Sequence, residues 1–192
     1  PATVVEGEIV LTSFAGKDFK AGAYTTVIPT EVAIAAETRY KAGPNAVVTG
    51  KDLDLVTGAT LGETALDYVY ADNAITFAIP AAAVDGAVTL KLANGKTVDT
   101  EAIELVKPVI TALSKTEIVA GDSVDIEGED LDLVTAVSLK GVAVEYKYDE
   151  ESGKITFETV GTSATGVVEL ACANGVKLEA GELTVTYDSY VV

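Results

Sequence analysis

The chain has 192 residues, of which 48% are hydrophobic, and this is enough for one large domain or two small ones with apolar cores. Its 13 basic and 30 acidic residues give a formal net charge of −17, and so acidic a surface repels the phosphate backbone of nucleic acids. No apolar run approaches the roughly 18 residues of a membrane helix and no signal-peptide pattern opens the chain, so we expect neither a nucleic-acid partner nor a transmembrane segment in it.

The N-terminal segment 1–28 aligns without gaps to a later stretch of the chain. PATVVEGEIVLTSFAGKDF from Pro1 lies over PAAAVDGAVTLKLANGKTV from Pro80, at an offset of 80 − 1 = 79. Residues 1–28 are therefore predicted to be the C-terminal hairpin of a preceding, truncated repeat. The chain also contains no Met, which indicates a piece of a longer product, so we expect an export signal or anchor in a missing N-terminal region.

The two strands of that hairpin, EGEIVLTSF and DFKAGAYTTV, would lack the opening strands that normally cover their apolar face. A two-stranded hairpin is marginal alone in water. Its apolar side chains should therefore pack against the first complete repeat, pair with a neighbouring molecule through the open edge, or be loosely ordered, and we favour the first two. These side chains are Ile9, Leu11, Tyr24 and Val27.

An eight-residue phrase occurs twice in the rest of the chain. GKDLDLVT begins at Gly50 and GEDLDLVT begins at Gly128, with seven of eight positions identical and an offset of 128 − 50 = 78. Such a repeat arises from a duplicated binding loop or from a duplicated domain in which the phrase is structural. The extent of the likeness decides between these two hypotheses.

The likeness continues far downstream of the phrase. ITF from Ile75 recurs from Ile155, and GAVTLKLANG from Gly86 matches GVVELACANG from Gly166. The offset has grown to 155 − 75 = 80, so the second copy has gained two residues, and the polar turn YDEESGK is where an insertion is tolerated. A whole domain is therefore duplicated.

Residues 29–107 and 108–192 are thus predicted to be two complete repeats. Each has about five to seven short strands rich in Val, Ile, Thr, Tyr and Leu, separated by Gly, Asn, Asp or Pro, which is typical of an antiparallel β-sandwich. The one helix competitor, AIPAAAVDGA from Ala78, is limited to a turn by Pro80 and Gly86. The two ANG triplets predict hairpins in which both Asn and Gly take positive φ. The predicted fold class is all-β.

The second repeat contains the segment PVITALSKTEIVAGDSVDIEGEDLDLVTAVSLKG, which is followed by ITF and a Gly-led strand pair. In this segment the repeat resembles the IPT/TIG group of immunoglobulin-like domains, an E-set-like fold. Both complete repeats carry the resemblance, which implies tandem immunoglobulin-like sandwiches. In that family a proline-led first strand precedes a glycine turn, a strand ending in Gly, an Asp or Asn before Leu, and a further glycine turn. The matching positions are Pro108, Gly121, Gly128, Asp130, Leu131 and Gly141, with Gly43, Gly50, Asp52, Leu53 and Gly62 in the first copy.

DLDLVT in series also resembles the tandem units of surface lipoproteins from gut Bacteroidetes, where such units are stalks for glycan-binding or adhesive modules. The chain departs from that group in two ways: neither repeat carries a Trp, and no distinct ligand-binding module follows Tyr187. The resemblance implies an extracellular position on the bacterial outer cell surface, lipid-anchored through the missing N-terminal region.

The aspartates of the phrase have a structural and a metal-binding interpretation. Ca²⁺ takes six to eight oxygen ligands, whereas each copy supplies two carboxylates. In the structural interpretation Asp side chains accept hydrogen bonds from local amides at a crossing between strands, and Leu53, Leu55 and Val56 anchor that crossing in the core. We favour the structural interpretation. The alternative metal ligands are Asp52, Asp54, Asp130 and Asp132.

Two tyrosine pairs are the candidate ligand-binding residues, because aromatic rings are platforms for sugars. DYVY and EYKY each place two rings on one face of a strand, at i and i+2. In the alternative interpretation these rings cover a sheet or pack between repeats and keep their hydroxyl groups in water. The residues are Tyr68, Tyr70, Tyr146 and Tyr148.

No enzyme class fits the sequence. The chain has no His for a catalytic triad or a zinc site and no GxxxxGK[ST] loop, and its single Cys172 excludes an internal disulfide and reads as a small core residue. Two of its many carboxylates could lie within reach of a glycosidic bond only by chance. We therefore predict no enzyme and no cofactor.

The predicted function is that of a non-enzymatic cell-surface spacer or adhesion module, whose tandem immunoglobulin-like domains hold or present a binding partner away from the cell. The alternative is a surface glycan-binding protein with tyrosine platforms that contact polysaccharide. The expected partners are other domains of the same polypeptide, and a polysaccharide or a surface protein.

Overall fold

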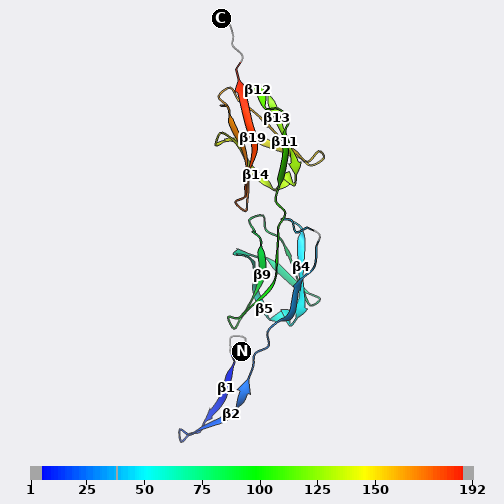
Figure 1. Cartoon of the computed structure of the whole chain (residues 1–192). Helices are drawn as coiled ribbons and strands as arrows, with labels where there is room; N and C mark the ends of the chain where they lie inside the picture. Colours follow the sequence, from blue (N-terminus) through cyan, green and yellow to red (C-terminus); the bar gives the residue numbers. More distant parts are fainter. Residues whose placement is uncertain (1–5, 38, 188–192) are drawn as a thin grey trace. The chain divides into compact units, whose positions relative to one another are not determined.

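The computed structural model describes residues 6–37 and 39–187, which are all-β apart from two short 3₁₀ turns (Figure 1). The chain divides into two compact units, Pro1–Glu104 (unit 1) and Leu105–Val192 (unit 2). Each unit contains a β-sandwich, and unit 1 also contains an N-terminal hairpin. The predicted fold class, all-β with immunoglobulin-like antiparallel sandwiches, is confirmed. No helix in the described residues has the length and apolar content that a membrane crossing requires.

Unit 2 is a sandwich of a four-stranded sheet, β11-β13-β17-β16, and a five-stranded sheet, β12-β19-β18-β14-β15. Neighbouring strands are antiparallel except β12 and β19, which run parallel. Residues 188–192 of the predicted second repeat lie outside the described residues. The strands are β11 (Val109–Leu113), β12 (Glu117–Val119), β13 (Ser123–Glu129), β14 (Val134–Leu139), β15 (Val142–Val144), β16 (Tyr146–Asp149), β17 (Lys154–Glu158), β18 (Gly166–Cys172) and β19 (Lys177–Thr186).

The sandwich of unit 1 is built from two four-stranded sheets, β3-β4-β8-β7 and β10-β9-β5-β6. At the place of β12, unit 1 has a single bridge residue, Tyr40. The strands are β3 (Thr30–Ile34), β4 (Asn45–Lys51), β5 (Val56–Leu61), β6 (Thr64–Ala65), β7 (Tyr68–Ala71), β8 (Ala74–Ala78), β9 (Gly86–Leu92) and β10 (Thr97–Ile103).

The two sandwiches share one strand order, and their difference in length lies in one turn. The turn between β7 and β8 has two residues, whereas the turn between β16 and β17 has four, which confirms the predicted place of the insertion. In the longer turn Gly153 N donates to Asp149 O at 2.8 Å. Ser152 Oγ and Glu151 N donate to the Asp149 carboxylate at 2.7 and 3.0 Å, and these bonds, that of Ser152 first, lower the pKa of Asp149.

The ANG hairpins differ in detail from the prediction. Leu92 N donates to Lys96 O and Gly95 N donates to Leu92 O, both at 3.0 Å, and only Gly95 takes positive φ, at 81°. Asn94 contributes its side chain instead, because its Oδ1 accepts from Lys96 N at 3.0 Å. This is a three-residue hairpin loop with Gly in the left-handed position, not a two-residue turn with positive φ at both positions.

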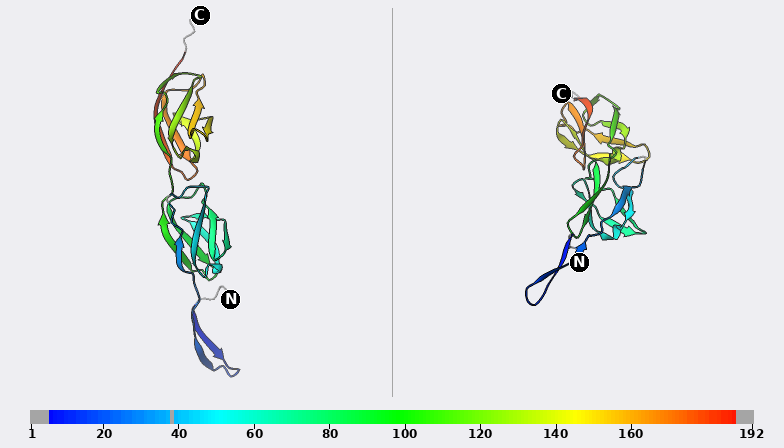
Figure 2. Two further views of the ribbon diagram at one scale, coloured as in Figure 1. Left: turned by 90° about the vertical axis from the view of Figure 1, so that its right-hand side faces the viewer. Right: turned by 60° about the horizontal axis from the view of Figure 1, so that its bottom comes forward.

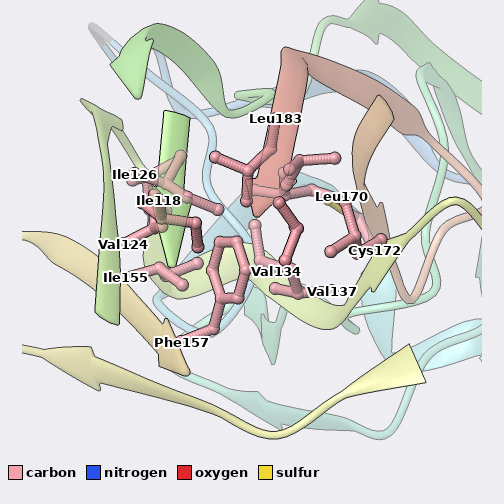
Figure 3. Close-up of a cluster of buried hydrophobic side chains, with 14 residues drawn as sticks. Ile118, Val124, Ile126, Val134, Val137, Ile155, Phe157, Leu170, Cys172 and Leu183 are labelled. Carbon is pink, nitrogen blue, oxygen red and sulfur yellow. The ribbon is translucent and has the colours of Figure 1, made fainter. Parts of the chain in front are cut away.

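The core of each sandwich comes from the alternating residues that face the opposite sheet. In unit 2, Phe157 points into the middle of the cluster, with Ile155 on one side and Val134 and Val137 on the other (Figure 3). Unit 1 buries Phe77 and Ile75 at the equivalent positions of β8. The period of two along each strand therefore specifies which side chains are buried.

β12, the second strand of unit 2, runs in the same direction as the last strand, β19. β12 pairs parallel to β19, with Glu117 opposite Thr184 and Val119 opposite Thr186. Further back, Leu113 at the end of β11 approaches Gly181 in the middle of β19. The polypeptide therefore enters the sandwich at one end and leaves it at the other.

The N-terminal hairpin, β1 (Gly7–Thr12) and β2 (Asp18–Tyr24), is a two-stranded sheet whose strands pair only with each other (Figure 2). Ile9 and Leu11 are 46% and 59% exposed, and Val27 is exposed as well. The expected packing against the first complete repeat is therefore wrong for these three side chains, because no further strand of unit 1 covers them, whereas Tyr24 is half-buried. Pairing with a neighbouring molecule stays a prediction. Residues 1–5 of the predicted 1–28 segment lie outside the described residues.

Candidate functional site

The repeated phrase forms the same backbone turn in both units. It crosses from one sheet to the other through η1 (Leu53–Leu55), between β4 and β5, and through η2 (Leu131–Leu133), between β13 and β14. The residue before each turn is left-handed: Asp52 has φ 58° and ψ 32°, and Asp130 has φ 55° and ψ 30°. Asp and Asn adopt this conformation more readily than other residues that carry a Cβ. The backbone conformation thus accounts for Asp at these two positions.

The glycine that opens each phrase lies where two strands approach closely. A Cβ added at Gly128 would lie 2.1 Å from Val109 O, and one added at Gly50 would lie 3.1 Å from Thr30 O. Real Cβ atoms essentially never come within 3.0 Å of another heavy atom, so Gly128 admits no side chain unless β11 moves. Gly50 therefore serves the pairing of β3 with β4, and Gly128 serves that of β11 with β13.

The leucines of the phrase lie on different sides of the turn. Leu53 and Leu131 are fully buried and anchor the crossing, as predicted. Leu55 is 38% exposed, so its predicted place in the core is wrong. A 3₁₀ turn rotates the chain by a third of a turn per residue, and side chains two positions apart therefore point in different directions.

The aspartates of the phrase do not form a metal cluster with other acidic groups. In the described part of the chain, no group of three or more Cys, Asp or Glu side chains is placed to hold a metal ion. The side chains of Asp52 and Asp130 make no cap hydrogen bond to the 3₁₀ turns, so the predicted bonding of local amides is not of this kind. The alternative metal site consists of Asp52 and Asp54 in one repeat and of Asp130 and Asp132 in the other. Among the described residues, the structure adds no third Cys, Asp or Glu ligand to either pair.

Tyr68 and Tyr146 tie the two sheets of their sandwiches together. Tyr68 Oη donates to Val56 O at 3.0 Å, and Tyr146 Oη donates to Val134 O at 2.9 Å. β7 and β16 belong to one sheet of each sandwich, whereas β5 and β14 belong to the other. Burial, and secondly the nearby Cys172, raise the pKa of Tyr146. These two hydroxyl groups are therefore used inside the fold.

The other tyrosine of each pair differs between the units. Tyr70 is 41% exposed, and its Oη donates to Asn73 Oδ1 at 3.4 Å. Asn73 Nδ2 in turn donates to Gly50 O at 2.7 Å, beside the repeated phrase. Tyr148 is half-buried and packs against the core cluster of unit 2. Each sandwich thus partly buries the strand face that carries its tyrosine pair.

Cys172 lies at the end of β18 in the core of unit 2. It is buried as a free thiol, and burial raises its pKa. A buried thiol with a raised pKa is a poor nucleophile, since the thiolate is the reactive form. The prediction of a small core residue is confirmed.

A cleft opens beside Tyr146, at the side of unit 2 where β15 and β16 are the edge strands of the two sheets. Its volume is about 500 Å³. Glu145, Lys147 and Glu158 give it charged groups of both signs, and Tyr146 and Phe157 give it apolar surface. We call it the β15–β17 cleft; its lining residues are Ala143, Val144, Glu145, Tyr146, Lys147, Thr156, Phe157, Glu158 and Val160.

Sequence reasoning found Tyr146 but missed the rest of this cleft. One signal was available, because Leu66 of the first repeat is replaced by the smaller Val144 in the second, at the offset of 144 − 66 = 78 that the repeated phrase has. Leu66 is buried, whereas Val144 is half-buried. Exposed Val160 stands where the first repeat has Pro80. The two repeats thus differ in apolar packing at this edge.

A second hollow lies in unit 1, at the side of the sandwich where β3 and β10 approach each other, and has a volume of about 360 Å³. Tyr40 lines it, and its Oη donates to Ala35 O at 2.8 Å, so this hydroxyl is also used by the fold. Arg39, Glu101 and Glu104 provide its charged rim. In unit 2 the corresponding side is closed by the pairing of β12 with β19.

No family model matches the chain, and no curated protein matches it significantly. Among solved structures it is similar to SGBP-B from a mixed-linkage glucan utilization locus of Bacteroides ovatus, in complex with a mixed-linkage heptasaccharide, with 20% identity over 94% of this chain and 52% of that chain, at a TM-score of 0.36. It is also similar to a surface glycan-binding protein from Prevotella bryantii, with 16% identity over 81% of this chain and 42% of that chain, at a TM-score of 0.39. A tandem from titin has 14% identity over 80% of this chain and 66% of that chain, at a TM-score of 0.37. The chain spans about half the length of the first of these proteins.

Proposed function

We propose that the chain is a non-enzymatic spacer or adhesion module of the bacterial cell surface, made of tandem immunoglobulin-like repeats of the IPT/TIG, E-set-like kind. It holds a binding partner, carried by other domains of the same polypeptide, away from the cell. Its complete repeats are residues 29–107 and 108–192, and residues 1–28 close a further repeat. A lipid anchor upstream of Pro1 is part of this proposal, and a lipobox cysteine in the precursor sequence would test it.

The observation that carries the proposal is the parallel pairing of β12, near the start of unit 2, with the last strand, β19. A sandwich that the chain enters at one end and leaves at the other can be joined head to tail by short connections. β19 alone has ten residues, and at about 3.3 Å per residue it runs about 33 Å along the sandwich. Each added repeat therefore adds length between whatever precedes it and whatever follows it.

The use made of the repeated residues supports the same function. Gly128 permits the approach of two strands, Asp130 takes a left-handed conformation, and Leu131 fills the core. Tyr146 connects the two sheets. A duplicated binding loop would leave such side chains free for a ligand, whereas here the duplicated residues maintain the sandwich.

Force spectroscopy on the full chain, pulled from its two ends, tests this function. A spacer must stay folded when its partner is pulled. β12 and β19 run parallel near the start and the end of unit 2, so pulling loads them in opposite directions and all their hydrogen bonds share the force. We expect one unfolding event per sandwich, with unit 2 resisting the higher force because unit 1 has only the Tyr40 bridge in place of β12. Extension without distinct unfolding events would overturn the proposal.

A matched variant identifies the contact that resists the force. Ala120 N donates to Thr186 O at 2.9 Å, next to the β12–β19 pair. Ala120→Pro removes this donor, so the unfolding force of unit 2 should fall while that of unit 1 stays the same. Denaturant unfolding of the variant, measured first, separates a mechanical effect from a general loss of stability.

The second candidate function is glycan binding, and the β15–β17 cleft favours it. Its volume of about 500 Å³ falls within the range of small-molecule sites, and an aromatic ring beside carboxylates is suited to a sugar ring and its hydroxyl groups. Tyr146 and Tyr148 are the binding residues in this proposal, with Tyr68 and Tyr70 as their counterparts in unit 1. A polysaccharide would then be a direct partner of the chain.

Affinity-gel electrophoresis on a panel of polysaccharides distinguishes the two functions. A glycan-binding chain is retarded in a gel that contains its ligand, whereas a spacer migrates equally in all gels. Val144→Leu restores the larger side chain that unit 1 has at Leu66, so it should narrow the cleft and weaken any retardation. Leu66→Val is the matched control and should leave migration unchanged. The same panel, assayed for released sugar, tests for glycosidase activity.

A further inference from the structure

The β1–β2 hairpin has an exposed apolar face, and the equivalent face of the closing hairpin is buried inside each of the two complete repeats. We define the hairpin face by Ile9, Leu11 and Tyr24. In the alignment of the repeats Ile9 corresponds to Val88 and Leu11 to Leu90, and both counterparts are fully buried. The equivalent side chains of unit 2 and the counterparts of Tyr24 are buried as well; these are Val168, Leu170, Ile103 and Leu183.

The hairpin has the local structure of the two closing hairpins at its turn. Ser13 N donates to Lys17 O and Gly16 N donates to Ser13 O, both at 2.8 Å, as Leu92 and Gly95 do in unit 1. Cys172 N and Gly175 N repeat the pattern in unit 2, at 2.9 and 3.0 Å.

The irregularity of the strand pair is repeated as well. Pairing shifts register between Ile9 and Val10 in the first hairpin, and between Val168 and Glu169 at the corresponding position of unit 2. In the β9–β10 pair the shift lies between Asp99 and Ala102 of β10, at the same level of the hairpin. A bulge re-aims the side chains on either side of it, so its recurrence places the hairpin face in the orientation needed for a sandwich.

The complete repeats show what covers such a face. In unit 1, β5 pairs with the free edge of β9 and places Leu61 opposite Val88 and Ala59 opposite Leu90. In unit 2, β14 pairs with β18 in the same register, and Leu139 lies opposite Val168. The opposite sheet, which includes β4 and β8, supplies Phe77 and its neighbours to the core. All of these strands lie within residues 29–79 of the first repeat or the equivalent part of the second.

We propose that the hairpin face is a docking surface for the opening strands of a further repeat of this kind. A strand equivalent to β5 pairs with the edge of β1, and strands equivalent to β4 and β8 cover Ile9 and Leu11. The product is a third sandwich whose closing hairpin is β1–β2. The occupant is a polypeptide segment with the strand pattern of residues 29–79.

A second copy of the chain is a poorer occupant. Its opening strands already pair with β9 and β18 of its own sandwiches, so they are released only by unfolding a repeat. Two hairpins packed face to face would cover their apolar side chains but would leave the edge of β1 without a partner strand. The register shared with the two sandwiches favours a complete set of opening strands.

The test supplies those strands in the same polypeptide. Residues 29–79 are duplicated and joined in front of the full chain, so that residue 79 precedes Pro1, the counterpart of Pro80. Hydrogen exchange of the β1 and β2 amides is compared between this fusion protein and the unfused chain. The fusion should slow the exchange of the β1 amides by roughly 100-fold or more, because they become part of a cooperative sandwich.

Two further proteins keep the test decisive. A second fusion carries residues 108–159 in front of Pro1, so that a mismatch between one set of opening strands and the hairpin does not decide the outcome. In either fusion, Leu11→Asp should return β1 to fast exchange by burying an unpaired charge. Fast exchange of β1 in both fusions would overturn the proposal. Slow exchange in the unfused chain that is lost on dilution would overturn it in favour of a homodimer.

Discussion

The β1–β2 and β9–β10 hairpins have the same structure in two different surroundings. Their turns are closed by equivalent backbone hydrogen bonds, and both pairs carry a bulge. Ile9 and Leu11 nevertheless face solvent, whereas Val88 and Leu90 are fully buried. Burial of a side chain of this size contributes about 1.5–3 kcal/mol, and the first hairpin forgoes this stabilisation.

The difference shows which parts of the fold are local. A Gly at the left-handed position of a three-residue loop and alternating apolar residues are enough to define the hairpin and its register. The stability of the hairpin comes from strands that are distant in sequence, such as β5 for β9. The local sequence of a closing hairpin therefore determines its backbone geometry, whereas the burial of its apolar side chains depends on the opening strands.

The largest expected effect is on the buried counterpart. Leu90→Ala removes a fully buried side chain and leaves a cavity, so it should lower the free energy of unfolding of unit 1 by about 2–5 kcal/mol. Leu11→Ala, at the equivalent exposed position, should change the same quantity by less than about 0.5 kcal/mol. Urea unfolding followed by NMR signals of each unit measures both values. Equal losses in the two variants would contradict the comparison.

The second prediction concerns the pairing of the first strand of each sandwich, β11 with β13 and β3 with β4, which the hairpin lacks. Gly128→Ala would place Cβ 2.1 Å from Val109 O, so β11 must shift, and unit 2 should lose about 1–3 kcal/mol. At Gly50 the corresponding distance is 3.1 Å, and Gly50→Ala should cost less. At Gly7 a Cβ would meet only the Tyr24 side chain, at 3.4 Å. Calorimetry should therefore rank the losses Gly128, Gly50, Gly7.

Much of the fold could be predicted from the sequence because its signals are short-range or repeated. Alternation along strands predicted the β-sandwich, and the change of offset from 78 to 80 placed the insertion in the β16–β17 turn. The repeated phrase identified Gly50, Asp52 and Leu53 as structural. Their individual roles were not all foreseen, since the close approach of Gly128 to Val109 O depends on a strand that lies well before the phrase in the chain.

What the sequence did not predict depends on contacts between the sheets. An i, i+2 pair of tyrosines indicates a shared strand face but not which face, and Tyr146 points its hydroxyl group at Val134 O of the opposite sheet. Leu55 looked like a core residue because its neighbours are apolar, and the rotation of the 3₁₀ turn exposes it. The β15–β17 cleft lies where β15 and β16 are the edge strands of the two sheets, and the replacement of Leu66 by Val144 was a local sign of it.

A third prediction tests the bond between the sheets, which only a complete sandwich can make. Tyr146→Phe removes the hydrogen bond to Val134 O, so unit 2 should lose about 0.5–1.5 kcal/mol. Tyr70→Phe is the control, because its exposed hydroxyl makes only a long contact to Asn73, and it should lose less. Denaturant unfolding compares the two variants.

The same tyrosine predicts a pH dependence in the alkaline range. Burial raises the pKa of Tyr146 above its unfolded value of about 10, so the folded chain favours the neutral hydroxyl more strongly than the unfolded chain does. Above about pH 10 the unfolded chain ionises this group more readily than the folded chain, and ionisation then favours unfolding. The contribution of this hydroxyl to stability is complete below about pH 10 and is lost as the pH rises through the folded pKa. The thermal midpoint of unit 2 should therefore fall more steeply above pH 10 in the parent chain than in Tyr146→Phe. Parallel curves for the two proteins would show that other groups cause the alkaline loss.

The smallest effect is expected from removing the hairpin altogether. Deletion of residues 1–28 takes away none of the buried hydrophobic side chains of the described core of unit 1. It breaks the ion pair of Glu6 with Lys96, at 2.6 Å, which lies at the surface and is worth at most about 1 kcal/mol. The thermal midpoints of both sandwiches should therefore stay close to those of the full chain. Pro29, which becomes the first residue, is buried and is the proposed start of the first complete repeat. A large loss of stability in unit 1 would mean that the hairpin completes that sandwich, and the boundary at Pro29 and the proposed docking face would both have to be abandoned.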